Sequence, residues 1–136
     1  MTKKEAAQIL AILKAAYPNF YKDMTSEEAQ GTVSVWSMQF ADISADIVLM
    51  AVNKLISTNK FPPTIAEVKE RFTSIHWEAY EKLYEGFYSP PLSGDEERLY
   101  KRIYEETERY RHHNRIEPTV AQMIGEEKIK QLKDKN

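Results

Sequence analysis

The side chains best suited to acid–base or metal chemistry are three histidines, His76, His112 and His113. Neighbouring side chains on a helix point about 100° apart, so the adjacent pair would not converge on one ion. The chain has no cysteine, and a metal site would need carboxylates such as Glu108 or Glu117 to complete it. Solvated histidines at a helix C-terminus, where the dipole favours cations, are the simpler interpretation. We therefore expect no metal site.

The other reactive groups are numerous but poorly arranged for catalysis. The sequence places no nucleophile or acid–base partner beside His76. Carboxylates such as Glu105 and Glu106 are neighbours in sequence, which separates them on a helix, and we interpret them as solvated helix faces. The four glycines form no phosphate-binding loop. We expect no catalytic residues, no cofactor and no enzymatic activity, so an ATP-driven motor acting with this protein would supply its own ATPase.

An aromatic row in the middle of the chain is the first candidate for a binding surface. Trp77, Tyr80 and Tyr84 recur at helical spacing. They could pack within the chain, most simply against Tyr100 and Tyr104, or form a second partner-binding surface for a protein or for stacked single-stranded bases. Base stacking requires interleaved basic residues, whereas the single lysine of this row stands among three acids. This pattern argues against nucleic acid.

A basic cluster near the end of the fifth predicted helix is the second candidate. Arg109, Arg111 and Arg115 lie close together, with two histidines between them. Phosphate contacts from such a cluster would suit a DNA-binding replication or regulatory module, which is our alternative function. Charge complementarity at a helix C-terminus explains the same residues equally well. The nearby acids argue against direct binding of nucleic acid.

The C-terminal segment is the third candidate and the one that we favour for partner binding. Residues 118–136 carry an apolar stripe, but so short a helix is marginal alone in water. We expect a mobile tail that can become helical in the groove of a partner, and a tail without a function is the alternative. The predicted contact residues are Val120, Met123, Ile124, Lys128, Ile129 and Leu132.

Helical periodicity along the chain predicts an all-α fold. Apolar residues recur at helical spacing over residues 2–17, 25–41, 45–57, 65–85 and 95–113. The first four helices should form a small orthogonal bundle, with residues 45–57 at its centre because that helix is apolar over a wide face. We expect Pro18 to end the first helix and residues 73–74 to interrupt the fourth.

Composition changes along the chain predict its domain organisation. A helical core domain should span residues 1–88, followed by a Ser/Pro/Gly linker at 89–94, a charged helix at 95–117 and the mobile tail at 118–136. The charged fifth helix has only a thin apolar stripe, and the sequence leaves open whether it docks on the core.

An elbow of one phenylalanine, two prolines and one threonine joins the third and fourth helices. Proline cannot continue the preceding helix, and it restricts Phe61 to an extended conformation. Thr64 and Glu67 should then form a capping box at the start of the fourth helix. We expect Phe61 to pack across this turn against Ile65 and Val68. The elbow would fix the angle between two helices, but it carries no reactive chemistry.

This elbow resembles that of the bacteriophage proteins that load and inhibit the replicative helicase. The similarity lies in residues 60–69, together with residues 25–29, 35–36, 40–42 and 51–56, and it extends over roughly residues 1–75. The resemblance implies a phage replication accessory protein that binds a hexameric DnaB-type helicase. It would inhibit that helicase and load it at the origin through an origin-binding protein, with a flexible C-terminal part engaging the motor. No individual contact residue can be carried over.

Length and charge agree with this expectation. A chain of 136 residues suits one domain with an extension, and the formal net charge of −2 creates no general attraction for nucleic acid. The longest apolar run, residues 47–52, is far too short to cross a bilayer. We expect a cytoplasmic protein of the host bacterial cell, with no membrane partner and no cofactor.

Overall fold

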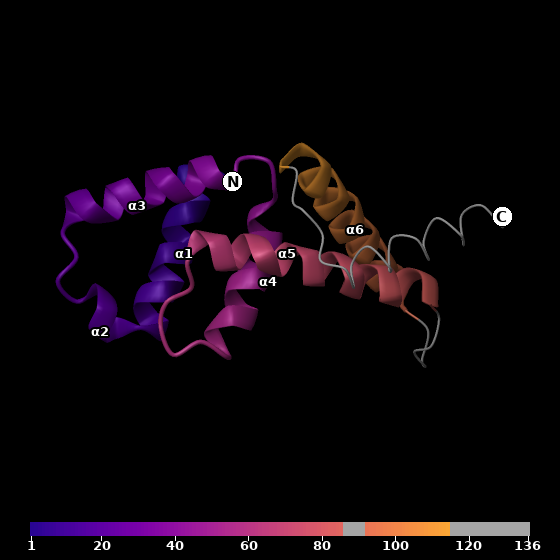
Figure 1. Cartoon of the computed structure of the whole chain (residues 1–136), viewed down its shortest axis with the longest axis horizontal. Coiled ribbons are helices and arrows are strands. Elements are labelled where there is room, and N and C mark those ends of the chain that lie inside the picture. Colours follow the sequence, from indigo (N-terminus) through magenta and orange to yellow (C-terminus); the bar gives the residue numbers. More distant parts are fainter. Residues whose placement is uncertain (86–91, 115–136) are drawn as a thin grey trace.

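The computed structural model describes residues 1–85 and 92–114 (Figure 1). Every regular element within these ranges is helical, which confirms the all-α fold, and none of these helices is long and apolar enough to span a membrane. Residues 89–91, half of the predicted linker, and the whole predicted tail lie outside the described residues. The elements are α1 (Lys3–Ala16), α2 (Pro18–Tyr21), α3 (Ser26–Gln39), α4 (Ala45–Ile56), α5 (Ile65–Tyr80), the π-helical turn η1 (Glu81–Glu85) and α6 (Gly94–Asn114).

Two capping boxes begin helices where the sequence predicts them. At the start of α1, the N–H of Thr2 donates to Glu5 at 2.9 Å, and the N–H of Glu5 donates back to the Thr2 hydroxyl at 3.1 Å. Thr64 and Glu67 repeat this exchange at the start of α5, with both distances 3.1 Å. Each box satisfies two backbone donors that a helix start would otherwise leave unpaired.

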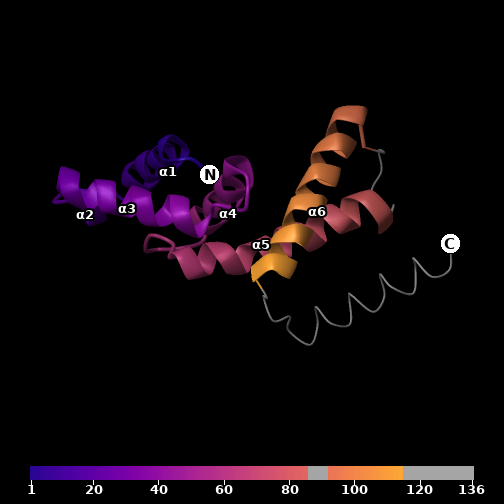
Figure 2. The same ribbon diagram turned by 90° about the horizontal axis from the view of Figure 1, so that it is seen from above.

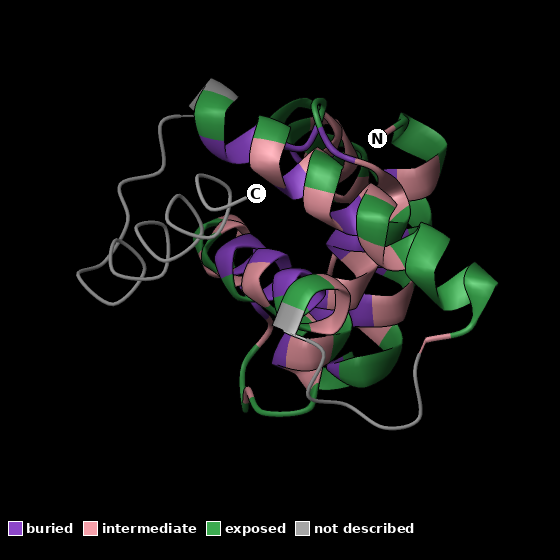
Figure 3. Cartoon of the chain, turned by 90° about the vertical axis from the view of Figure 1, so that its right-hand side faces the viewer, coloured by how far each residue is buried: buried purple, intermediate pink, exposed green. Residues whose placement is uncertain are grey.

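Helix α4 lies at the centre of the core, as its wide apolar face predicts. Five of its twelve residues are buried, and they belong to one continuous hydrophobic cluster with residues of α1, α3, α5 and α6. Figure 3 shows the pattern over the whole fold, in which each long helix has a buried side and an exposed side. The buried residues of α4 are Ile47, Val48, Ala51, Val52 and Leu55.

Of three local predictions, one is confirmed and two need correction. Pro18 follows the end of α1, as predicted, and it also begins the short helix α2, because proline at the first helical position loses no hydrogen bond. Thr73 and the residue after it do not interrupt α5, since the Thr73 side chain is buried in a continuous helix. Phe61 does not pack across the elbow. It is 59% exposed, while Pro63 and Val68 are buried there.

Helix α6 docks on the core, which the sequence left open. It runs along the C-terminal half of α5, on the side away from α1 and α3 (Figure 2). Ile103 and Tyr110 are each 1% exposed and belong to the same hydrophobic cluster as α4. The ring of Tyr110 meets Phe72 of α5 edge to face at 5.0 Å between centroids. Although charged over most of its surface, α6 is therefore part of the folded unit.

Candidate protein-interaction surfaces

The aromatic row of α5 and η1 is packed mainly against α6. Tyr80 is buried, Trp77 is half-buried, and Tyr84 is 58% exposed. The ring of Tyr104 lies 6.3 Å from Tyr80 and 5.8 Å from Tyr84 between centroids, and burial raises the pKa of Tyr104 to about 12. This is the intramolecular packing that the sequence offered as one alternative. A role of Trp77, Tyr80 and Tyr84 in partner binding stays a prediction, and Tyr84 is the residue most available for it.

A buried histidine joins the same two helices. The His76 side chain lies fully inside the fold, stacked on Tyr104 with 4.7 Å between ring centroids. Its Nδ1 atom lies 2.9 Å from the hydroxyl oxygen of Thr107, which itself donates to the carbonyl of Ile103 at 2.7 Å. Which of these two atoms donates depends on the tautomer of His76, but the contact joins the two side chains in either case. The geometry assigns His76 to helix docking, which sequence analysis did not predict.

Glu108 gathers the charged groups around this interface. One carboxylate oxygen lies 3.1 Å from Nε2 of His76, and the other lies 3.0 Å from Nε2 of His112. Arg111 lies 3.8 Å from Glu108, and its guanidinium is stacked over Trp77 at 5.4 Å from the ring centroid. Within the described residues, no group of three or more potential ligand side chains is arranged to hold a metal ion.

The structure divides the predicted basic cluster. Arg111, its central residue, is only 9% exposed because it packs on Trp77, whereas Arg109 is exposed on the opposite side of the helix. Arg115 lies outside the described residues. Phosphate binding needs several cations on one accessible surface. In the described part of α6, the arginines do not form such a surface, so the geometry does not favour the DNA-binding alternative.

The predicted tail contacts cannot be located in the fold. Val120, Met123, Ile124, Lys128, Ile129 and Leu132 all lie outside the described residues, so their role in partner binding stays a prediction.

An exposed pair of phenylalanines lies at the other end of the molecule. Phe20 of α2 and Phe61 of the elbow are 56% and 59% exposed, and their rings meet edge to face at 5.4 Å. The hydroxyl of Tyr17 donates to the carbonyl of Asn59 at 2.9 Å and holds the elbow against the end of α1. Large aromatic side chains held rigidly at the surface are typical anchors of protein interfaces. Sequence analysis missed this pair, because residues so far apart in sequence meet only in the fold.

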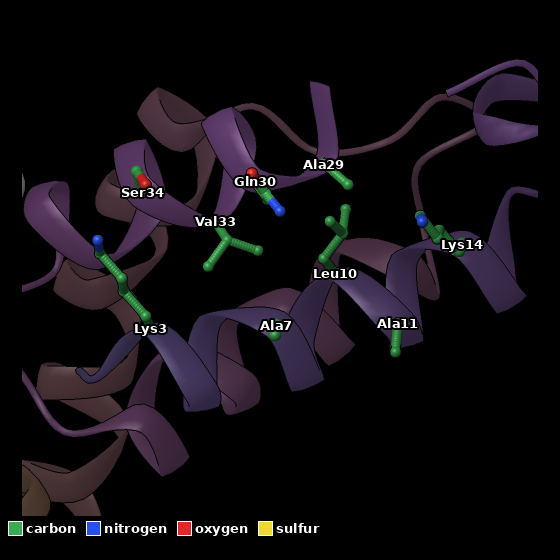
Figure 4. A pocket seen from close by; sticks show the side chains of 9 residues that line it. All are labelled: Lys3, Ala7, Leu10, Ala11, Lys14, Ala29, Gln30, Val33 and Ser34. Carbon is green, nitrogen blue, oxygen red and sulfur yellow. The ribbon is translucent and has the colours of Figure 1, made fainter. Parts of the chain in front are cut away.

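A shallow groove runs between α1 and α3 (Figure 4). Its volume is about 510 Å³, and both walls are mostly apolar or small. Leu10 and Val33 point toward each other across it, while Lys3 and Lys14 stand at its two ends. Sequence analysis missed the groove, since it depends on how two helices pack. The lining residues are Lys3, Ala7, Leu10, Ala11, Lys14, Ala29, Gln30, Val33 and Ser34.

The fold and these surfaces define a small helical protein whose accessible features are apolar patches and grooves. Residues 1–69, which include α1 to α4 and the start of α5, match the family model for the N-terminal domain of the phage helicase loader and inhibitor gp39P. That match covers half of the chain and confirms the resemblance in the sequence. The chain belongs to the gp39P family of phage helicase-associated proteins. Comparisons with curated proteins and with solved structures gave no match.

Proposed function

We propose that this protein is a non-enzymatic replication accessory protein that binds a hexameric DnaB-type replicative helicase, holds it inactive and loads it at the origin. The observation that carries the proposal is its membership of the gp39P family through residues 1–69. The protein would act in the host cytoplasm, and an origin-binding protein would be the second partner.

In this proposal the two partners use different parts of the chain. The tail residues, from Val120 to Leu132, bind the helicase, and the folded helices present a second surface. Tyr84 is the exposed member of the aromatic row, and the Phe20–Phe61 pair offers a further rigid patch. Inhibition then follows from differential binding: a ligand that prefers one helicase conformation stabilises that conformation. The helicase supplies all of the ATP hydrolysis.

The test combines binding with an activity assay. The purified full chain is mixed with a DnaB-type helicase and ATP, and the mixture is analysed by size-exclusion chromatography and by strand unwinding. We expect a stable complex and a loss of unwinding that increases with the concentration of this protein. A helicase that elutes alone and unwinds at its normal rate would contradict the proposal.

A further inference from the structure

The groove between α1 and α3 exists because the residues facing it are small. Ala7 and Ala11 of α1 and Ala29 of α3 line it, so the two helices enclose a channel that Leu10 and Val33 fill only at its floor. Leu10 is buried and Val33 is half-buried, whereas Ala7 and Ala11 are exposed. Packing between α1 and α3 therefore covers the floor of the groove but leaves its alanine wall exposed, where a further helix could bind.

The charges that line this groove are all of one sign. Lys3 and Lys14 are its only charged lining residues. They lie eleven residues apart on one helix, which separates their backbones by about 16 Å. Neither lysine makes an ion pair with any residue in the ranges 1–85 and 92–114. Gln30 and Ser34 complete the rim with neutral polar groups, so nothing in the lining offsets the two positive ends.

We propose that this groove binds an acidic amphipathic helix of a partner protein. A third helix of about three turns fits an open channel between two helices, because its apolar stripe can cover the floor. Carboxylates near both ends of that stripe would meet Lys3 and Lys14, which gives the site a charge preference. The inference does not depend on which partner supplies the helix, so it stands apart from the proposed binding to the helicase.

The charge pattern also favours an acidic partner helix over two other possible occupants of the groove, the tail of this chain and a second copy of the protein. The tail of this chain, residues 118–136, carries four lysines, at positions 128, 130, 133 and 135, against three acids, so its charge is not the acidic one that the two lysines of the groove favour. A second copy of the folded unit would bring the same two lysines. Each alternative predicts a measurable outcome. If the tail occupied the groove, deletion of the tail would shift the amide signals of the groove residues. If a second copy occupied it, dilution of the protein would shift them.

The first experiment maps the site. The full chain, labelled with ¹⁵N, is titrated with a helix-stabilised peptide of about four turns that carries a leucine stripe and glutamates at both ends. A second peptide has lysines in place of the glutamates. We expect amide shifts in residues 3–14 and 29–34 with the acidic peptide alone, and a weaker effect at high salt. The proposal would be overturned if both peptides had equal effects, if the shifts were centred elsewhere, or if no shifts occurred. It would also be overturned if dilution, or deletion of residues 118–136, shifted the signals of the groove residues.

Variants then test the two features of the groove separately. Lys3→Glu with Lys14→Glu should weaken the acidic peptide about tenfold, whereas Lys3→Arg with Lys14→Arg should retain binding. Ala7→Gln with Ala11→Gln should also weaken it, because long side chains at these exposed positions occupy the groove without disturbing the core. The matched controls are Lys4→Glu and Ala15→Gln, which are exposed on α1 outside the groove. Controls that weaken binding as much as the groove variants would contradict the assigned site.

Discussion

Glu106 of α6 accepts a hydrogen bond from the backbone N–H of Ser44, 62 residues earlier in the chain, at 3.1 Å. Ser44 is the N-cap of α4, but its side chain caps no backbone group of its own helix. Its hydroxyl donates to the same Glu106 carboxylate, which also pairs with Arg102 at 2.8 Å. In a capping box, a glutamate three residues into the helix accepts the N-cap N–H. Here a distant helix supplies that glutamate, so α6 contributes directly to the start of the central core helix.

Replacing Glu106 with alanine should therefore destabilise the whole fold. The substitution removes the acceptor for Ser44 at a site where the Glu106 side chain is only 13% exposed. We expect the free energy of unfolding to fall by about 1–3 kcal/mol, measured by urea denaturation. Glu105→Ala, at an exposed position on the same helix, is the control and should change it by no more than about 0.5 kcal/mol. Equal effects of the two variants would show that the contact with Ser44 contributes nothing specific.

A second prediction concerns the buried contact between His76 and Thr107. Thr107→Val keeps the shape of the side chain but removes the hydrogen-bond partner of Nδ1 of His76, a residue that is 0% exposed. We expect a loss of about 1–3 kcal/mol in the free energy of unfolding, because a buried polar atom loses its partner. Thr32→Val is the matched control, since the Thr32 hydroxyl donates to the Glu28 carbonyl of its own helix at 3.0 Å and the residue is only half-buried. A loss no larger than that of the control would contradict the assigned role.

The capping boxes predict how stability depends on pH. Hydrogen bonds from the backbone of Thr2 and Thr64 lower the pKa of Glu5 and Glu67 below the ordinary value of 4.5. Folding thus favours the ionised carboxylates, so their contribution is present above about pH 4.5 and is lost as the pH falls through the lowered pKa values. Glu5→Gln with Glu67→Gln should flatten this part of the curve of melting temperature against pH. Glu70→Gln, which changes an exposed glutamate of α5 outside the box, should leave the acid limb of the curve steep.

A fourth prediction uses a position where the fold does not need glycine. A methyl group on Gly31 of α3 would meet nothing within 4 Å. Alanine is favoured over glycine in a helix interior by about 1 kcal/mol, so Gly31→Ala should raise the free energy of unfolding by about that amount in thermal or urea denaturation. A decrease would show that α3 packs more closely against its neighbours than the structure indicates.

The parts of the fold that were predictable from sequence depend on local chemistry. The start of α5 was predictable because Thr64 and Glu67 lie three residues apart, and the central place of α4 was predictable because its apolar face is wide. The start of α2 at Pro18 was not, since proline both ends one helix and suits the first position of the next.

The surfaces were less predictable, because they depend on residues far apart in the sequence. Nothing local shows that Arg111 lies over Trp77, or that Phe20 meets Phe61. The docking of α6 was equally hidden. Its apolar stripe is thin, and polar contacts such as that between Glu106 and Ser44 join it to the core beside buried residues such as Tyr110. The family match was available from sequence because it depends on the elbow and on the helices before it.

The central claim is that the folded helices and the C-terminal tail have separate roles, and that the tail binds the helicase. The most direct test compares the full chain with a chain that ends at residue 117, measuring affinity for a DnaB-type helicase and melting temperature in parallel. We predict that the shorter chain loses helicase binding and keeps its melting temperature. Retained binding, or a large fall in the melting temperature, would contradict the claim.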